Sequence, residues 1–405
     1  MRRVTGVLSV ALALGACGGD EGLPPVEWSG TPGTPVPARL DQWVPSVDVT
    51  LDGDPHHVLI DTGAPRTLLD SGAFGGVAPG PYDVDLTLGD LQFPALEVAI
   101  YDVFGAQSRE PPLDGLLGAD VFEQFALTVD YLGETVTLGE SPADTDGATV
   151  LDVSVAGGGG FPIPGSGNAL DVDATRVILH ADAEGHDVWV LVDTGASATV
   201  ASGDLMALLG DAGRPRLEGV TVGTATGIAS AYFTRVGSLR LGGDAGAALT
   251  SLPVIVLEDD ALFDSIRAEV GEPVQAIVGG TALRWFDTTI DYPTERLVLR
   301  RYADPSHIDP DEFVAVGFTV AGGAGNWHID DVIPGSDAAA EGLQPGEPLE
   351  TIDGTDVNAF SREAIDDLLL EFGLGDEVPV GVFRSGEVVT LDIRVEDLLP
   401  DFEGP

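Results

Sequence analysis

Two short segments of this sequence carry nearly the same residues in the same order. Residues 58–64 read Val-Leu-Ile-Asp-Thr-Gly-Ala and residues 190–196 read Val-Leu-Val-Asp-Thr-Gly-Ala, which places Asp61 and Asp193 132 positions apart (193 minus 61). Two carboxylates that face each other around a water molecule cannot both ionise, so the pair holds one proton. The ionised carboxylate can then act as a base and the protonated one as an acid. Asp61 and Asp193 are therefore the candidate catalytic residues, and which of them holds the proton stays open because a coupled pair titrates as a unit.

The elements that must position these carboxylates are repeated as well. Each Asp-Thr-Gly turn follows a short apolar run that predicts a strand. Gly118 and Gly279 each end a second apolar run, and each lies 13 positions before a tyrosine, Tyr131 (131 minus 118) and Tyr292 (292 minus 279). Alternating β-branched residues after each tyrosine predict a hairpin. A lone Asp-Thr-Gly would be an ordinary turn, but matched spacing over several elements indicates a duplicated, mainly β unit.

With these motifs, residues 40–302 resemble a two-lobed aspartic protease in which each lobe is retropepsin-like. The resemblance implies two acid-protease β-barrel lobes with a central cleft, at 40–139 and 175–302, and an endopeptidase that hydrolyses extended polypeptides. By the same resemblance, the threonines after the two aspartates would tie the turns together across the lobe interface, and the glycines would let the backbone approach closely. For the threonines, an ordinary place at a strand end is the alternative. These supporting residues are Thr62, Gly63, Thr194 and Gly195.

The residues that follow the two motifs depart from the resemblance. Retroviral enzymes usually carry an Asp there that grips the substrate backbone, and this sequence has Pro65 and Ser197 instead. The substrate must therefore be gripped differently. Arg66 would favour an ionised Asp61 if its side chain turned inward, and would otherwise lie in solvent.

Lobe two is the longer lobe. Gly242 follows Asp193 by 49 positions (242 minus 193), whereas its counterpart Gly89 follows Asp61 by 28 (89 minus 61). The additional residues include a Gly-edged hairpin, and such a hairpin near a cleft can close over it. A surface hairpin without contact to the cleft is the alternative. We expect one flap, on lobe two, formed by Gly223, Thr224, Ala225, Thr226 and Gly227.

The residues between the lobes, 140–174, are rich in glycine and proline. They contain the run Gly157–Gly160 but no Gly-Lys-Thr and no helical pattern after it, which argues against a phosphate-binding loop. We expect an exposed connector here.

Residues 312–398 resemble a bacterial PDZ domain, which implies an α+β unit. The resemblance rests on Pro334–Gly346, where a short alanine helix ends at Gly342, and on the Ile-Asp-Gly that begins at Ile352. It implies a groove that adds a peptide as an extra strand and reads its last apolar side chain. The module's own core is an alternative for the helix residues, because apolar stripes usually face inward. The implied peptide-binding residues are Val316, Gly317, Phe318, Ile365 and Leu369.

The N-terminus resembles a bacterial lipoprotein signal. Two arginines and an apolar run form a signal peptide at 1–16, and Cys17, the only cysteine of the sequence, would be lipidated. An ordinary signal peptide with a stray cysteine is the alternative. Residues 17–39 predict a flexible tether. We therefore expect secretion across the inner membrane and a lipid anchor in the bacterial cell envelope, at the outer membrane or its periplasmic face.

The composition limits the partners and the chemistry. The formal net charge is -49, which would repel nucleic acid and anionic membrane surfaces. The sequence contains no lysine, which excludes Schiff-base chemistry and the lysine of an ATP-binding loop. The six histidines are scattered without zinc spacing, so we expect no metal and no cofactor. A monomer is expected, since both lobes lie on one chain.

The sequence thus predicts an aspartic endopeptidase with a polypeptide in its cleft and a peptide or protein tail in the PDZ groove. The alternative is a catalytically inactive, protease-like peptide-binding scaffold of the cell envelope. A purely structural envelope protein is a third interpretation.

Overall fold

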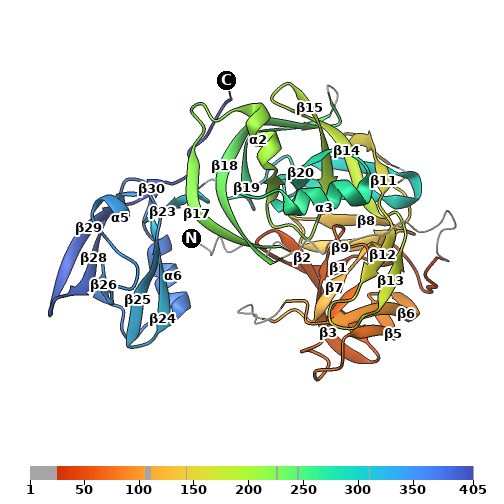
Figure 1. Cartoon of the computed structure of the whole chain (residues 1–405), viewed down its shortest axis with the longest axis horizontal. Coiled ribbons are helices and arrows are strands. Elements are labelled where there is room, and N and C mark those ends of the chain that lie inside the picture. The colour runs from red at the N-terminus through yellow and green to blue at the C-terminus, as the bar shows by residue number, and fades with distance from the viewer. Residues whose placement is uncertain are drawn as a thin grey trace.

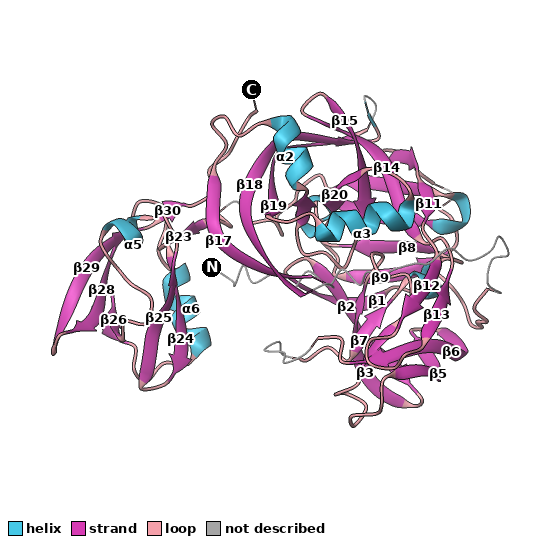
Figure 2. Ribbon diagram, viewed as in Figure 1, coloured by secondary structure: helices cyan, strands magenta, loops and turns pink. Residues whose placement is uncertain are grey.

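The computed structural model describes residues 25–104, 111–142, 144–224, 227–243, 246–309 and 311–404. Strands predominate among them, and they form two lobes and a smaller third module (Figures 1 and 2). The prediction of a mainly β fold is confirmed. The predicted signal peptide and Cys17 lie outside the described residues.

Lobe one consists of short strands whose side chains alternate between core and solvent, as the alternating apolar residues of β5 illustrate. Its strand order is β1-β2-β3-β7-β4-β6-β5, and β3 and β7 run parallel with Leu59 beside Leu116. The elements are β1 (Val36–Asp41), β2 (Val44–Leu51), β3 (Asp54–Ile60), β4 (Leu68–Asp70), β5 (Gly80–Leu88), β6 (Leu91–Tyr101), β7 (Gly115–Leu117), α1 (Ala119–Phe122), β8 (Ala126–Asp130) and β9 (Thr135–Gly139).

Lobe two repeats this arrangement and adds one strand. Its order is β14-β15-β20-β16-β19-β18-β17, and β15 and β20 run parallel with Leu191 beside Ile277. Strand β17 at the edge has no counterpart among the described residues of lobe one. The elements are β14 (Arg176–Ala183), β15 (His186–Val192), β16 (Thr199–Ala201), α2 (Gly203–Leu209), β17 (Arg216–Thr224), β18 (Gly227–Leu241), β19 (Ala247–Leu257), α3 (Ala261–Val270), β20 (Val274–Val278), α4 (Gly280–Leu283), β21 (Phe286–Asp291), a 3-10 turn (Tyr292–Thr294) and β22 (Arg296–Arg301).

A shared sheet joins the lobes, with strand order β10-β22-β21-β8-β9-β1. At its centre β8 of lobe one pairs with β21 of lobe two, and the hydroxyls of Thr128 and Thr289 lie 2.8 Å apart. One hydrophobic core cluster runs through both lobes beside this sheet. The two lobes therefore share a common base, which fixes the distance between the turns above it.

The prediction of an exposed connector at 140–174 is wrong. This segment forms four strands, of which β10 pairs with β22 and β11 pairs with β14. The other two, β12 and β13, form a separate hairpin whose Phe161 and Leu170 are buried against lobe one. Glycine and proline dominate the composition here, but the few apolar residues alternate and so share one face. The strands are β10 (Thr149–Asp152), β11 (Ser154–Ala156), β12 (Gly159–Pro162) and β13 (Ala169–Val172).

The prediction of a flexible tether is wrong for residues 25–39. Strand β1 already begins at Val36 and pairs with β2 and β9. Before it, Ser29 forms a backbone bridge with Gln92, and the Trp28 ring packs 4.9 Å from the Phe125 ring. These residues belong to lobe one.

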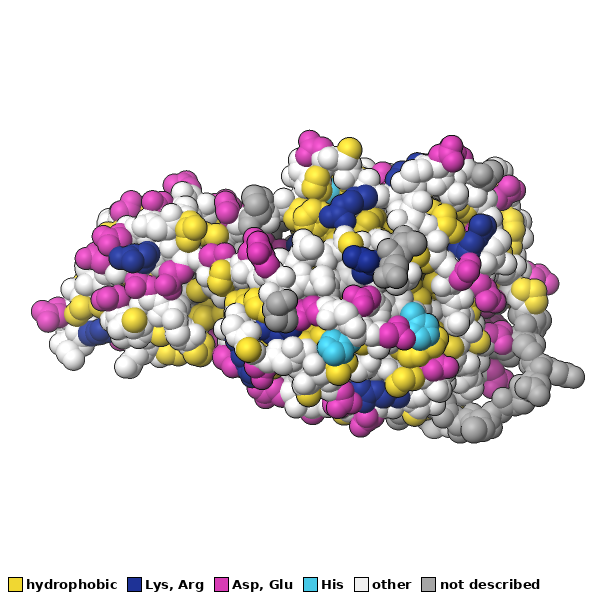
Figure 3. Space-filling model, turned by 90° about the horizontal axis from the view of Figure 1, so that it is seen from above, with side chains coloured by type: hydrophobic (Ala, Val, Ile, Leu, Met, Phe, Trp, Pro, Cys, Tyr) yellow, Lys and Arg dark blue, Asp and Glu magenta, His cyan; other side chains and the backbone are white. Residues whose placement is uncertain are grey.

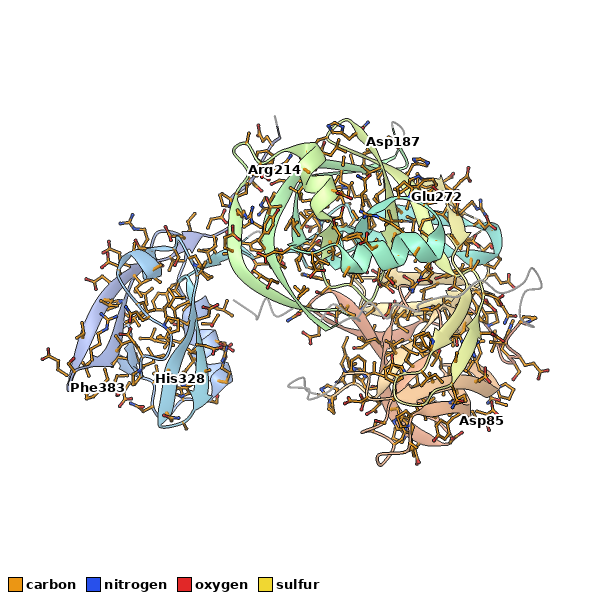
Figure 4. The ribbon with its side chains drawn as sticks, in the orientation of Figure 1. Asp85, Asp187, Arg214, Glu272, His328 and Phe383 are labelled. Atoms are coloured by element: carbon orange, nitrogen blue, oxygen red, sulfur yellow. The ribbon has the colours of Figure 1, made fainter. Side chains whose placement is uncertain are left out.

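The third module is a small α+β unit that lies beside lobe two (Figure 1). Its own core is separate, but Phe313 and Leu399 at its base pack with Phe233 of lobe two, and Arg284 forms an ion pair with Glu312 at 2.6 Å. Figure 4 shows the labelled His328 and Phe383 at the end of the module far from both lobes. The elements are β23 (Val314–Ala315), β24 (Phe318–Gly323), β25 (Asn326–Val332), α5 (Asp337–Ala340), β26 (Leu349–Ile352), β27 (Thr355–Asp356), α6 (Arg362–Leu370), β28 (Glu377–Arg384), β29 (Glu387–Arg394) and β30 (Glu396–Asp397).

Candidate active site

The two Asp-Thr-Gly turns are held at the ends of equivalent strands. The backbone N–H of Asp61, after β3, donates to the carbonyl oxygen of Leu117 in β7 at 3.0 Å. The N–H of Asp193, after β15, donates to that of Val278 in β20, also at 3.0 Å. Each turn is thereby fixed between two parallel strands of its own lobe.

Threonine side chains join the two turns across the lobe interface. The N–H of Thr62 donates to Oγ1 of Thr194, and the N–H of Thr194 donates to Oγ1 of Thr62, each at 3.1 Å. The hydroxyls donate onward to the strand ends of the opposite lobes, from Thr194 to the Ile60 carbonyl at 2.8 Å and from Thr62 to the Val192 carbonyl at 3.3 Å. Both threonines are fully buried. The turns are therefore locked to one another.

Each carboxylate lies against the glycine of the opposite turn. A Cβ atom added at Gly63 would lie 2.4 Å from Cγ of Asp193, and one added at Gly195 would lie 2.4 Å from Cγ of Asp61. No side chain fits there, so glycine is required for the close approach. The N–H of Gly195 also donates to Oδ1 of Asp193 at 2.8 Å. The structure thus brings Asp61, Asp193 and both glycines together at the interface of the lobes.

The environment of the two carboxyls raises the pKa of both. Both are completely buried. Burial raises the pKa of Asp61 well above its usual value, and the charge of Asp193 raises it further. Burial also raises the pKa of Asp193, while the hydrogen bond from the Gly195 N–H opposes that rise. Two buried carboxyls of this kind interact, so they lose their protons as a coupled pair.

A buried ion pair lies near the carboxylates, and sequence reasoning missed it. Nε of Arg176, at the start of β14, lies 2.9 Å from Oε1 of Glu269 in α3, and both side chains are almost fully buried. The Arg176 charge lowers the pKa of both aspartates. Arg176 precedes Asp193 by 17 positions (193 minus 176), and Val44 precedes Asp61 by 17 (61 minus 44). Comparing the repeats position by position would have singled out this arginine.

Arg66 takes neither of the two positions expected from the sequence. It is buried rather than in solvent, and its guanidinium pairs with Glu97 at 3.0 Å and with Asp120 at 3.7 Å. Its charge opposes the burial that raises the pKa of Asp120. Asp120 in turn accepts hydrogen bonds from the N–H and the hydroxyl of Thr67. Arg66 therefore supports the base of lobe one.

Three of the residues predicted as a flap, Gly223, Thr224 and Gly227, lie at the paired ends of β17 and β18 in lobe two. Gly223 and Thr224 end β17, Gly227 begins β18, and Thr224 pairs with Gly227. Ala225 and Thr226 lie outside the described residues. Before the tip, Val222 is buried in the cluster that contains Leu191 and Ala196 beside the second aspartate.

The predicted peptide-binding residues of the third module divide into two groups. A cavity of about 240 Å³ lies between β24 and α6, and Val316, Phe318 and Leu369 line it. Gly317 adopts a φ of 72°, which favours glycine. Ile365 does not line the cavity and is completely buried in the module's core, so its assignment to the peptide site is wrong. It lies on the face of α6 that packs inward, the alternative that helical periodicity left open.

Clusters of acidic or potential metal-ligating side chains among the described residues could mark a further site. Figure 3 shows Asp and Glu side chains scattered over the visible face. Within the described ranges, no three His, Cys, Asp or Glu side chains gather in a way that could hold a metal ion. No helix in that part of the chain has the length and apolar character needed to cross a membrane.

Comparison with known proteins gives one family match. Residues 179–280 match the family model described as aspartyl protease. An aspartic proteinase from Irpex lacteus is 15% identical with a TM-score of 0.42 and covers 67% of this chain and 97% of its own. An aminopeptidase N family protein from Idiomarina loihiensis is 22% identical with a TM-score of 0.19 and covers 21% of this chain and 14% of its own. Among curated proteins there is no match. The family match falls within lobe two and includes Asp193, Thr194 and Gly195.

Proposed function

We propose that this protein is an aspartic endopeptidase that uses Asp61 and Asp193 with a shared water molecule. One observation carries the proposal: two fully buried carboxyls meet over each other's glycines, and burial raises the pKa of both. Peptide hydrolysis by paired carboxyls requires two such groups that face each other and hold one proton between them.

The reaction uses the two protonation states of the pair. The ionised carboxylate draws a proton from the water as the water oxygen attacks the peptide carbonyl carbon. The protonated carboxyl donates a hydrogen bond to the carbonyl oxygen, where negative charge develops. A later proton transfer to the amide nitrogen releases the amine product. Thr62 and Thr194 hold the turns at a fixed separation, so little reorganisation is needed during the reaction.

The third module is proposed to be a PDZ domain that binds a peptide or protein tail. The support is its cavity between β24 and α6, with Val316 and Phe318 on the strand side and Leu369 on the helix side. An extended peptide could add beside β24, whose described partner is β25 alone. The module would recruit substrate or dock a partner. Lipidation of Cys17, and with it an anchor in the cell envelope, remains a proposal from the sequence.

A peptide-binding scaffold without catalysis is the second candidate, and one observation favours it. Neither aspartate is exposed at all in this structure, so a polypeptide cannot reach them in this conformation. The two candidates differ in turnover.

Product mapping on a denatured protein mixture, from acid to neutral pH, separates them. The proposal expects new peptide ends that disappear in Asp61→Asn and in Asp193→Asn. Asp187→Asn, at an exposed position of lobe two, is the matched control and should cleave like the unaltered chain. The scaffold interpretation expects peptide retention by the unaltered chain without new ends.

A further inference from the structure

The complete burial of both aspartates means that an element of the chain must move before any polypeptide can bind. A nucleophilic water and a scissile carbonyl both have to lie within hydrogen-bond reach of the carboxyls. The moving element must lie beside the aspartates and must be able to separate from its lobe without unfolding it.

The hairpin formed by residues 157–172, the connector hairpin, is attached to lobe one by side chains alone. Strands β12 and β13 pair only with each other and join no larger sheet. Within the described part of the chain, the hydrogen bonds of residues 159–172 also stay inside the hairpin, for example from the Ile163 N–H to the Asn168 carbonyl. One face is buried and the other, with Pro162 and Asp171, is exposed. Its removal would break no ladder of either lobe.

The buried face of the connector hairpin covers the apolar residues of lobe one that flank the first aspartate. Leu59 lies two positions before Asp61, Ala64 three positions after it, and Leu116 beside Leu59 in the parallel pair. All three are buried in one cluster with the hairpin. The hairpin side chains in this cluster are Phe161, Ile163, Leu170 and Val172.

Tyr101, at the end of β6, packs against the hairpin. Its ring lies 6.3 Å from the Phe161 ring. Burial raises the pKa of Tyr101, and the charge of Asp61 raises it further. The hairpin therefore packs beside β6 as well as over the apolar residues that flank Asp61 in sequence.

Glycines at the start of the connector hairpin supply a hinge. Gly157, Gly158 and Gly159 have φ values of 90°, 117° and 122°, which other residues rarely adopt. Because glycine also has access to many other conformations, this run can change direction at low cost. At the other end of the hairpin, the turn at Gly165 meets Pro79 of lobe one.

We propose that the connector hairpin is a displaceable lid, which occupies the lobe-one face that flanks Asp61 and swings about Gly157–Gly160 to admit a polypeptide. A polypeptide substrate must then displace the connector hairpin from this face before it can bind there. The proposal rests on the proposed peptidase site, but it can be tested without turnover.

A cross-link between the hairpin tip and lobe one tests the lid directly. A Cβ at Gly165 would lie 3.8 Å from Cβ of Pro79, within the range of about 3.5–4.5 Å for disulfides. In a chain with Cys17→Ser, the pair Gly165→Cys and Pro79→Cys would lock the lid when oxidised. The probe is a peptide with a hydroxyethylene group in place of one amide, whose hydroxyl can take the place of the shared water.

We expect the oxidised protein to bind this probe at least tenfold more slowly than the reduced protein, with recovery after addition of dithiothreitol. The single-cysteine variants, each with Cys17→Ser, should not respond to oxidation. Phe161→Ala should accelerate binding in the uncross-linked chain, because it weakens the packing of the lid without touching a strand ladder. Equal association rates in the oxidised and reduced forms would overturn the lid.

Hydrogen exchange separates failure of the lid from failure of the proposed function. With a lid, the amides of 159–172 exchange at least tenfold faster than those of β3 and β7, and the cross-link slows them. If no form binds the probe or cleaves peptides while exchange follows this pattern, the lid stands and the peptidase proposal falls. If the hairpin exchanges as slowly as β3, it is a fixed part of lobe one and the lid is refuted.

Discussion

Lobe one and lobe two carry equal catalytic turns but are covered in different ways. In lobe two, the residues beside Asp193, such as Leu191 and Ala196, pack under Val222 of the lobe's own β17 and under Phe263 of α3. In lobe one, the corresponding Leu59 and Ala64 pack under the connector hairpin. The chemistry needs two matching turns, because both carboxyls must meet. The elements that pack over the residues beside each aspartate need not match. Lobe two uses its own β17 and α3, and lobe one uses the connector hairpin from between the lobes.

The charges around the two turns differ as well. Lobe two has Arg176 where lobe one has Val44, and both side chains are buried. The arginine charge acts on both carboxyls. The coupled pair is therefore asymmetric in its surrounding charges. It is also asymmetric in its hydrogen bonds, because Oδ1 of Asp193 accepts one from the Gly195 N–H, whereas neither carboxyl oxygen of Asp61 has a partner among the described residues.

The largest effect is expected from the carboxyls themselves, and it should be equal in the two lobes. Asp61→Asn and Asp193→Asn should each lower kcat/KM for peptide cleavage by about 10²–10⁴-fold, since each removes one partner of the acid–base pair. The double variant should be little worse than either single variant, because the two groups act as a unit. Steady-state kinetics on a library-derived peptide measures this. An Asn variant that still cleaves would break the equivalence of the lobes.

Replacing the glycines should give the next largest loss. Gly63→Ala and Gly195→Ala each place a methyl group 2.4 Å from a carboxyl carbon, so the opposite aspartate must shift. A displacement of about 1 Å can cost roughly 10²-fold in rate, and overpacking costs about 1–3 kcal/mol of stability. Kinetics and thermal unfolding report the two effects. Gly323→Ala, where an added Cβ meets nothing within 4 Å, is the control and should change neither.

The threonines should affect stability more than chemistry, and not equally. Thr194→Val and Thr62→Val each leave a buried N–H of the opposite turn without its acceptor, at a cost of about 1–3 kcal/mol. Thr194→Val should cost more, because the hydroxyl bond to Ile60 is 2.8 Å and its counterpart to Val192 is 3.3 Å. Denaturant unfolding measures the difference. Serine variants keep the hydroxyl and should recover most of the loss, and a reversed order would contradict the distances.

Removing the Arg176 charge should have the smallest of the predicted effects, a shift of the pH profile of kcat/KM. Arg176 lowers the pKa of both aspartates, so its loss raises both values. The double variant Arg176→Met, Glu269→Gln avoids an unpaired buried charge. The acidic limb of kcat/KM should then move to higher pH, because the base becomes protonated at a higher pH. Val44→Met at the equivalent position of lobe one should leave the limb in place. A shift in both variants would mean that altered packing, not charge, moves the limb. No shift in either variant would mean that the Arg176 charge does not act on the carboxyls.

The sequence predicted the parts of the fold that depend on local pattern. The two apolar runs before Asp61 and Asp193 form strands, and their equal downstream spacing appears as equivalent parallel pairs, β3 with β7 and β15 with β20. Periodicity could not decide whether Leu369 and Ile365, both on α6, face a cavity or the core. Their separation depends on how the helix is rotated against β24, which packing sets.

Long-range contacts explain the remaining errors. The connector was expected to be exposed because glycine and proline outnumber its apolar residues, but Phe161 and Leu170 find a partner face in lobe one. Arg176 was missed because its partner Glu269 lies 93 positions away, on helix α3 of lobe two. Arg66 was expected either to turn toward Asp61 or to lie in solvent, whereas its guanidinium pairs with two acidic side chains, Glu97 and Asp120.

The most direct test of the central claim is to count the protons on the carboxyl pair by carbon-13 NMR. Aspartate side chains are labelled at the carboxyl carbon, and Asp61→Asn and Asp193→Asn assign the signals. At the pH of maximal kcat/KM we predict that the pair holds one proton and titrates in two coupled steps, with its upper pKa well above that of an ordinary aspartate. Two carboxyls that titrate independently near the ordinary value would contradict the account.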